Sequence, residues 1–243
     1  MASDSETLDR ISPSRRPDLP VAGTQTWNDL GFVHWSFPPE VVRKLVPASL
    51  ELDLWKGRAW VGIVPFTMKN IRSAWMPQRA GLDFLETNVR TYVHHDREPG
   101  VHFFSLEASS WLAVRVARFV WGLPYFFADM ETSRDGDRLT WRSTRKDAEK
   151  TNSLVELELG DELGASAPGT LEHFLLERYY LFQEHRGRVL KGIVHHVPYP
   201  VRRAKLMSAV DGLLGAVGLP GGDLETAHFS SGVDVEVFGP DPV

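Results

Sequence analysis

The polar residues best suited to chemistry occupy alternate positions of one stretch, from Leu85 to His94. Glu86, Asn88 and Arg90 share one face of the strand that this alternation predicts, because successive strand side chains point to opposite faces. A carboxyl, an amide and a guanidinium in one row suit the binding of a small acid and the transfer of a proton. The other interpretation, which periodicity alone favours, is a strand face exposed to water.

Two further arginines, Arg115 and Arg118, lie three positions apart on a helix predicted from Ser109 or Ser110 to about Trp121. The helix is otherwise apolar, so we expect at least one of these arginines to press against the sheet. A buried arginine needs a carboxylate partner, and Glu86 or Glu107 can serve. Such an ion pair has two open interpretations: it neutralises the interior, or it holds an acidic substrate.

Several common site motifs are missing from the sequence. It contains no Walker loop, no GxGxxG, no HExxH and no GxSxG. The absence of cysteine excludes disulfides, thiolate metal sites and a cysteine nucleophile. Two pairs of adjacent histidines, His94-His95 and His195-His196, point to opposite faces of predicted strands, so neither pair chelates one ion. We therefore predict no metal and no cofactor.

The composition describes a chain that folds around a core. Its 243 residues are 42% hydrophobic and carry a net charge of −5, which excludes global disorder and gives no attraction to nucleic acid. No apolar run approaches the roughly 18–20 residues of a membrane-spanning helix. The first residues are polar, contain prolines and lack the apolar region of a secretory signal. We expect a cytoplasmic protein that contacts neither membranes nor nucleic acid.

The elements that position these residues are about ten short strands with three or four short helices inserted. Hairpin signals between the strands predict a mainly antiparallel α+β fold whose sheet curls on itself. Residues 1–24 are predicted to be a flexible lead-in, and 25–243 a single domain. The stretch from 202 to 218 is ambiguous, with a helix favoured in its later half.

Two segments resemble the acetoacetate decarboxylase-like superfamily. HWSFPPEVVRKLVPASLELD is similar to its early signature, and AVRVARFVWGLPYFFA is similar to a segment in which Arg118 and Pro124 match the superfamily's arginine and proline. Glu86 matches the glutamate that helps to form the decarboxylase pocket. Within the superfamily the chain more closely resembles an uncharacterised bacterial family, the YqjF-like proteins, through AWVGIVPFTM, ETNVRTYV, PGVHFFSLEA, LPYFFADM and HFSSGVDV.

The resemblance implies a curled sheet or cone-like barrel with surrounding helices and a central pocket. The decarboxylases carry two consecutive lysines after the proline, one of which forms a Schiff base; here these positions are Tyr125 and Phe126. A phenol forms no imine, so Schiff-base decarboxylation is lost at this position. Lys69 and Lys191 are remote substitutes, and we expect both to be solvated charges at strand ends.

We therefore predict an acid–base enzyme of lyase, hydratase or isomerase type, acting on a small carbonyl or carboxylate compound. Glu86 and Tyr125 are the predicted catalytic residues, and Arg118, Arg90 and Asn88 the predicted substrate ligands. The alternative is a non-catalytic ligand-binding or sensing domain that kept the pocket after losing the lysines. The predicted partner is a small molecule, and because superfamily members often associate, a homo-oligomer is a further open prediction.

Overall fold

The computed structural model describes residues 8–243, apart from the side chains of Asp211 and Asp223. Its strands, in chain order, are β1 (Gly23–Phe37), β2 (Glu51–Leu52), β3 (Ala59–Ser73), β4 (Leu82–His95), β5 (Glu98–Ala108), β6 (Tyr125–Asp135), β7 (Arg138–Arg145), β8 (Asn152–Gly164), β9 (Tyr180–His185), β10 (Arg188–His195), β11 (Val201–Asp211) and β12 (Asp223–Pro242). Its helices are α1 (Pro39–Arg43), α2 (Trp111–Trp121), α3 (Leu171–Leu176) and α4 (Gly212–Ala216), with 3-10 turns η1 (Ser12–Ser14) and η2 (Gln78–Ala80).

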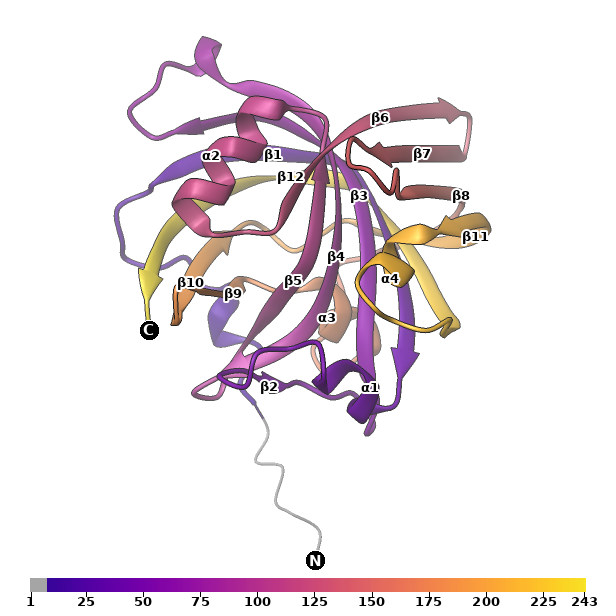
Figure 1. Cartoon of the computed structure of the whole chain (residues 1–243), viewed down its shortest axis with the longest axis horizontal. Helices are drawn as coiled ribbons and strands as arrows, with labels where there is room; N and C mark the ends of the chain where they lie inside the picture. Colours follow the sequence, from indigo (N-terminus) through magenta and orange to yellow (C-terminus); the bar gives the residue numbers. More distant parts are fainter. Residues whose placement is uncertain (1–7) are drawn as a thin grey trace, which may run out of the picture.

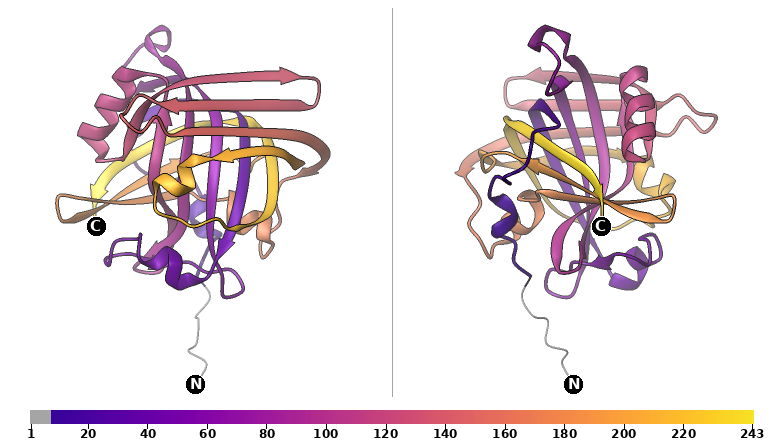
Figure 2. Two further views of the ribbon diagram at one scale, coloured as in Figure 1. Left: turned by 45° about the vertical axis from the view of Figure 1, so that its right-hand side comes forward. Right: turned by 90° about the vertical axis from the view of Figure 1, so that its left-hand side faces the viewer.

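The strands form one curled, mostly antiparallel sheet, as the sequence predicts. Its order is β10-β9-β5-β6-β7-β8-β11-β12-β1-β3-β4-β2, and further pairings join β4 to β5 and β10 to β12. Only the pairings of β5 with β6 and with β9 are parallel among the described strands. Strands β6 to β8 run across the upright strands β1, β3 and β4 (Figure 1, Figure 2). The curl therefore gives the upright strands one concave and one convex face, each covered by other elements.

Helix α2 is the crossover between the parallel strands β5 and β6, and its buried Val114 belongs to the same apolar core as Phe66 and Tyr125 (Figure 1). Ser110 caps its start by accepting a hydrogen bond from the Ala113 N–H, and Gly122 ends it in the left-handed conformation. The predicted position of the helix is confirmed. Val114 is its one buried residue, whereas Phe119 is 81% exposed. Both Arg115 and Arg118 are exposed, but Arg118 contacts the sheet through a hydrogen bond from its Nε to the Tyr125 carbonyl, so the expectation that one arginine lies against the sheet is met without burial.

Helix α3 covers the concave face of the upright strands. Thr170 caps it by accepting a hydrogen bond from the His173 N–H, and the residues from His173 to Leu176 are buried. The Phe174 ring lies 5.1 Å from the ring of Tyr92 on β4. Around this contact is an interior core that includes Phe32, Trp60, Phe66, Phe174 and Tyr199. A second core fills the convex side and includes Val33, Trp35, Val89, Trp141 and Leu157. Strands β1, β3 and β4 are thus buried on both faces.

Two regions add detail to the predicted outline. In the ambiguous stretch, β11 continues to Asp211 by pairing with β8, so the helix favoured there is reduced to the five residues of α4. The lead-in is described from residue 8 onward, and residues 1–7 lie outside the described part. Its Arg16 pairs with Glu236, the Nε and Oε2 atoms being 2.6 Å apart. No helix in residues 8–243 combines the length and apolarity needed to cross a membrane.

Candidate functional site

Glu86 and Tyr125 meet inside the curl of the sheet. Glu86 on β4 lies opposite Phe66 and Ala108, while Tyr125 opens β6 beside Leu106. The Tyr125 hydroxyl donates a hydrogen bond of 2.7 Å to Oε2 of Glu86. Both side chains are buried, with 3% and 8% of their surface exposed. The two predicted catalytic residues are therefore in direct contact.

The environment of Glu86 holds its carboxyl group in the neutral form. Its pKa is raised from the 4.5 of a solvated glutamate to about 8, mainly by burial and in smaller part by the nearby charge of Glu107. Hydrogen bonds from Tyr125 and Asn88 oppose this effect because they favour the carboxylate. Burial and the neighbouring Glu86 raise the pKa of Tyr125 well above its ordinary value. At neutral pH both groups keep their protons, so the pair can donate one.

Arg90 lies on the same face of β4 and is 8% exposed. Its Nη2 donates to the Leu175 carbonyl at 3.0 Å, and its guanidinium lies 5.7 Å from the centre of the Phe32 ring. Among the described residues no carboxylate lies within ion-pairing distance of it, and its buried Nε has no hydrogen-bond acceptor. Arginine cannot shed its charge by losing a proton. The interior therefore holds a permanent positive charge without a counter-ion.

Tyr92 and His34 form a hydrogen-bonded chain to the Leu175 carbonyl, which Arg90 also binds. The Tyr92 hydroxyl donates to Leu175 at 2.8 Å and lies 2.8 Å from Nε2 of His34. Because that hydroxyl has one proton, the imidazole donates to it and Nδ1 remains an acceptor. Gly62 makes this contact possible, since a Cβ there would lie 2.9 Å from Nε2 of His34. Burial and the charge of Arg90 lower the pKa of His34 well below 6.5, which keeps the imidazole neutral.

Asn88 lies between Glu86 and Arg90 on β4 and is 5% exposed. Its Oδ1 is buried without a donor. Asn88 Oδ1 and Arg90 Nε thus form an acceptor and a donor that the protein itself leaves unused. The water-exposed interpretation of this strand face is wrong, because α3 and the curled sheet enclose it. Of the predicted site residues, the structure brings Glu86, Asn88, Arg90 and Tyr125 together in the interior.

Arg118 lies elsewhere. It is exposed on α2, and its Nε donates to the main-chain carbonyl of Tyr125 at 2.6 Å, which ties the helix to the start of β6. No ion pair joins it to Glu86 among the described residues, so the interpretation in which Arg118 neutralises Glu86 finds no support. The arrangement places Arg118 next to the backbone of the site rather than inside it.

Glu107 is paired with Arg145, which sequence reasoning missed. Arg145 Nε lies 2.9 Å from Oε1 of Glu107, and both side chains are almost fully buried. The guanidinium also lies 3.8 Å from the centre of the Phe126 ring. The signal was the alternation along β7, where Leu139, Trp141 and Ser143 are buried at every second position and Arg145 continues the series. This pair lies on the convex side of the sheet and holds Phe126 there.

The two lysines considered as substitutes, Lys69 and Lys191, do not reach the interior. Lys69 pairs with Asp83 at 2.9 Å, and Lys191 with Glu98 at 2.6 Å. Lys191 is therefore not the solvated charge that the sequence suggested, since it also lies over the ring of Tyr180. In residues 8–243 no group of three histidine, cysteine or acidic residues is arranged to hold a metal ion.

A cavity of about 530 Å³ lies on the convex side of the sheet, between β11, α4 and the loop that follows α4. Its lining is mostly apolar and includes Trp35, Leu206, Leu214, Leu219 and Leu224. None of the predicted site residues contributes to it, and it offers few polar groups to orient a substrate. The groups that chemistry requires are therefore Glu86, Asn88 and Arg90 on the concave side, and not the lining of this cavity.

The sequence is similar to those of known proteins. Residues 24–234 match the DUF2071 family, described as an uncharacterized conserved protein. The uncharacterized protein YqjF of Bacillus subtilis (strain 168) is 36% identical over 214 residues, which cover 87% of this chain and 88% of the relative.

Similar folds occur among solved structures. The enduracididine biosynthesis enzyme MppR complexed with pyruvate has a TM-score of 0.65 at 13% identity and covers 94% of this chain and 93% of its own. Acetoacetate decarboxylase from Legionella pneumophila subsp. pneumophila str. Philadelphia 1 has a TM-score of 0.64 at 12% identity, with coverages of 100% and 98%. An acetoacetate decarboxylase-like enzyme from Sphingomonas wittichii RW1 has a TM-score of 0.64 at 13% identity, with coverages of 93% and 94%. At these identities the likeness shows the fold alone.

Proposed function

Because this chain belongs to the DUF2071 family and folds like acetoacetate decarboxylase, we propose that it is an acid–base enzyme acting on a small carbonyl or carboxylate compound inside the curled sheet. Glu86 is the proton donor, and Tyr125 orients its carboxyl group. Arg90 and Asn88 bind the substrate. The reaction is of lyase, hydratase or isomerase type, since these reactions need a proton moved at carbon or oxygen and no imine.

The observation that carries this proposal is the buried carboxyl of Glu86 in hydrogen-bond contact with Tyr125. A carboxylic acid with a pKa of about 8 donates a proton to a developing enolate or alkoxide at neutral pH, and its conjugate base then recovers one. The Tyr125 hydroxyl, 2.7 Å away, stabilises the carboxylate that forms. Its own raised pKa keeps that hydroxyl protonated throughout.

Arg90 supports the proposal from the same strand face. A guanidinium in the interior without a counter-ion costs several kcal/mol, which a bound carboxylate offsets by forming a charge-assisted hydrogen bond. The unused acceptor of Asn88 adds a position for a hydroxyl or amine of the substrate. The complex of MppR with pyruvate indicates that a keto acid is a sensible first ligand class for this fold.

The second candidate function is a binding domain without catalysis. Tyr125 and Phe126 favour it, because they occupy the positions that match the lysines of the decarboxylases. In a binding domain of this kind, Glu86 serves as a neutral hydrogen-bond donor to a ligand that leaves unchanged.

A screen followed by turnover assays separates the two functions. A library of keto acids and carboxylates is ranked by thermal shift, and each hit is incubated with the protein while products are followed by NMR. We expect product formation that Glu86→Gln abolishes without loss of folding. Glu131→Gln, an exposed glutamate on β6, is the matched control and retains full turnover. Turnover that survives in Glu86→Gln contradicts the catalytic role, and a tightly bound ligand returned unchanged favours the binding domain.

A further inference from the structure

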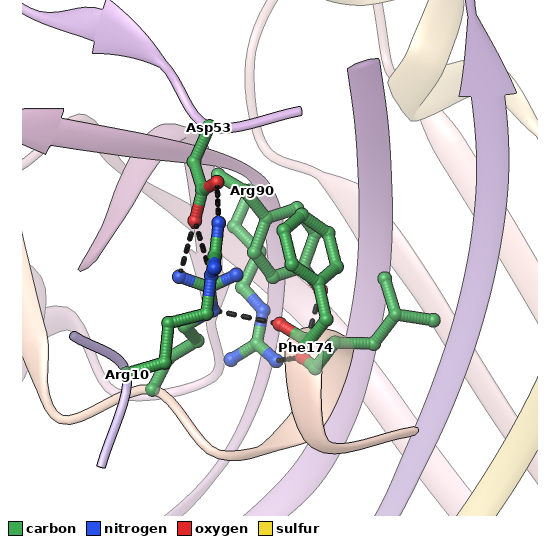
Figure 3. Close-up of polar contacts among 7 residues, drawn as sticks. Arg10, Asp53, Arg90 and Phe174 are labelled. Atoms are coloured by element: carbon green, nitrogen blue, oxygen red, sulfur yellow. Dashed lines mark hydrogen bonds and ion pairs between the residues drawn. The ribbon is translucent and has the colours of Figure 1, made fainter. Parts of the chain in front are cut away.

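Two arginines pair with one buried carboxylate, Asp53, at the edge of the interior core, and a third, Arg90, lies nearby (Figure 3). Asp53 is 2% exposed and accepts hydrogen bonds from Arg178, at 2.8 Å, and from Arg10 of the lead-in. Arg178 also donates its Nε to the Phe174 carbonyl, next to the Leu175 carbonyl that Arg90 binds. We call Arg10, Arg90 and Arg178 the arginine cluster.

The arginine cluster carries more positive charge than its surroundings neutralise. Asp53 is the one carboxylate that pairs with it among the described residues, so two positive charges have no counter-ion. The pKa values of nearby histidines respond to this excess after the larger effect of burial. Arg178 and Arg10 lower the pKa of His173, and Arg90 contributes to lowering that of His196 to about 4. These imidazoles are neutral, and the positive charge belongs to the guanidiniums.

Unused hydrogen-bond donors mark where a ligand can attach. Arg90 Nε and Arg178 Nη2 are both buried without an acceptor, on side chains that are more than nine-tenths buried. Both guanidiniums lie beside the Tyr92 ring, 5.8 Å and 5.0 Å from its centre, and they bind adjacent carbonyls of α3. The two unused donors therefore belong to neighbouring guanidiniums on the same α3 backbone.

We propose that the arginine cluster binds a ligand with two negative charges, either a dicarboxylate or a phosphate monoester. This inference rests on the proposed function, since it takes Arg90 as the substrate ligand and specifies the substrate's charge. A single carboxylate leaves one of the two positive charges uncompensated, whereas a dianion matches both.

Arg10 has a particular role because it belongs to the lead-in. Its side chain is 24% exposed and lies over the Phe174 ring, at 5.4 Å from the centre. Arg178 alone keeps Asp53 paired when Arg10 is removed, so the fold does not depend on it. Hydrogen bonds to Asp53 attach Arg10, but repulsion from Arg178 weakens this attachment, and a bound anion relieves the repulsion. The dianion thus strengthens the seating of the lead-in over the site.

The test compares ligands of matched size on the whole chain. Affinities for succinate and for butyrate are measured by calorimetry, and we expect succinate to bind at least about tenfold more tightly. Arg10→Gln lowers this ratio severalfold while the protein stays folded. Arg16→Gln, which removes another lead-in arginine whose partner is Glu236, leaves the ratio unchanged. Glycerol 3-phosphate is the second arm, and an affinity above that of succinate assigns the dianion to a phosphate monoester.

The outcomes separate this inference from the proposed function. If butyrate binds, is lost in Arg90→Gln and equals succinate in affinity, the dianion inference is overturned and the proposed function stands. A ratio that Arg10→Gln leaves untouched also overturns it. If neither succinate nor glycerol 3-phosphate binds the wild-type protein, the dianion inference is overturned, whereas the proposed function is decided by the turnover screen with Glu86→Gln.

Discussion

Replacing Glu86 with glutamine should remove a large pH dependence of stability. Glutamine keeps the shape of the neutral carboxyl group but does not titrate. In the wild type the pKa rises on folding from 4.5 to about 8, so the folded protein holds a proton that the unfolded chain releases. For a group whose folded pKa is raised, the stability it confers is full below pH 4.5 and is lost as the pH rises through 8. The wild type must therefore weaken toward alkaline pH relative to Glu86→Gln.

The magnitude follows from the two pKa values. Linkage gives a slope of up to about 1.4 kcal/mol per pH unit between them, which amounts to about 3–4 kcal/mol of wild-type stability lost from pH 5 to pH 8. For a chain of this size that loss corresponds to roughly 7–14 °C in melting temperature. Tyr125 keeps a hydrogen-bond acceptor in the variant, because the glutamine carbonyl replaces the carboxyl oxygen.

Urea unfolding at half-unit intervals from pH 5 to pH 9 measures the effect. The quantity to plot is the difference in unfolding free energy between Glu86→Gln and wild type, since the buried histidines titrate in both proteins and cancel. Glu131→Gln is the control and should follow the wild type at every pH. A difference that stays flat within about 0.5 kcal/mol refutes the reasoning, because it means that Glu86 is ionised in the folded protein.

Three further outcomes are expected. Gly62→Ala destabilises the protein by about 1–3 kcal/mol in urea unfolding, because its Cβ meets His34, whereas Gly215→Ala, with open space around it, does not. Glu107→Gln costs about 3–5 kcal/mol by leaving Arg145 buried and unpaired, and adding Arg145→Met restores much of this; an unaffected single variant contradicts the buried pair. Tyr125→Phe removes a donor that favours ionised Glu86, so the alkaline end of the wild-type stability loss moves to higher pH; a shift to lower pH rejects the contact.

Local patterns in the sequence were sufficient to predict most helices and strands and to group the residues of the site. The caps at Ser110 and Thr170 were predictable because a side-chain oxygen accepting from an N–H three residues on is a local event. The alternation from Leu85 to His94 likewise placed Glu86, Asn88 and Arg90 on one face. The positions that match the decarboxylase lysines led to Tyr125, which does contact Glu86.

Local patterns could not predict which distant element covers each face of a strand. The enclosure of Arg90 depends on Leu175, which is 85 positions away in the chain, and that of Asp53 on Arg178, which is 125 positions away. Alternation says which residues share a face but not which element will cover it. Helix α2 shows the opposite error. Its apolar composition suggested burial, but Phe119 is exposed to solvent because no element within residues 8–243 covers that side of the helix.

Strand β12 has a consequence for the order in which the sheet assembles. It pairs with β1, β10 and β11 and lies between β1 and β11 in the sheet, although β1 and β12 are far apart in the sequence. Until the two strands pair, β1 exposes one edge of backbone donors and acceptors, and the interior lacks one of its walls. Closure of the sheet therefore depends on long-range contacts, which form slowly. The two ends of β12 contribute differently, because Pro242 and Asp241 pair with β10 whereas the residues up to Val237 pair with β1.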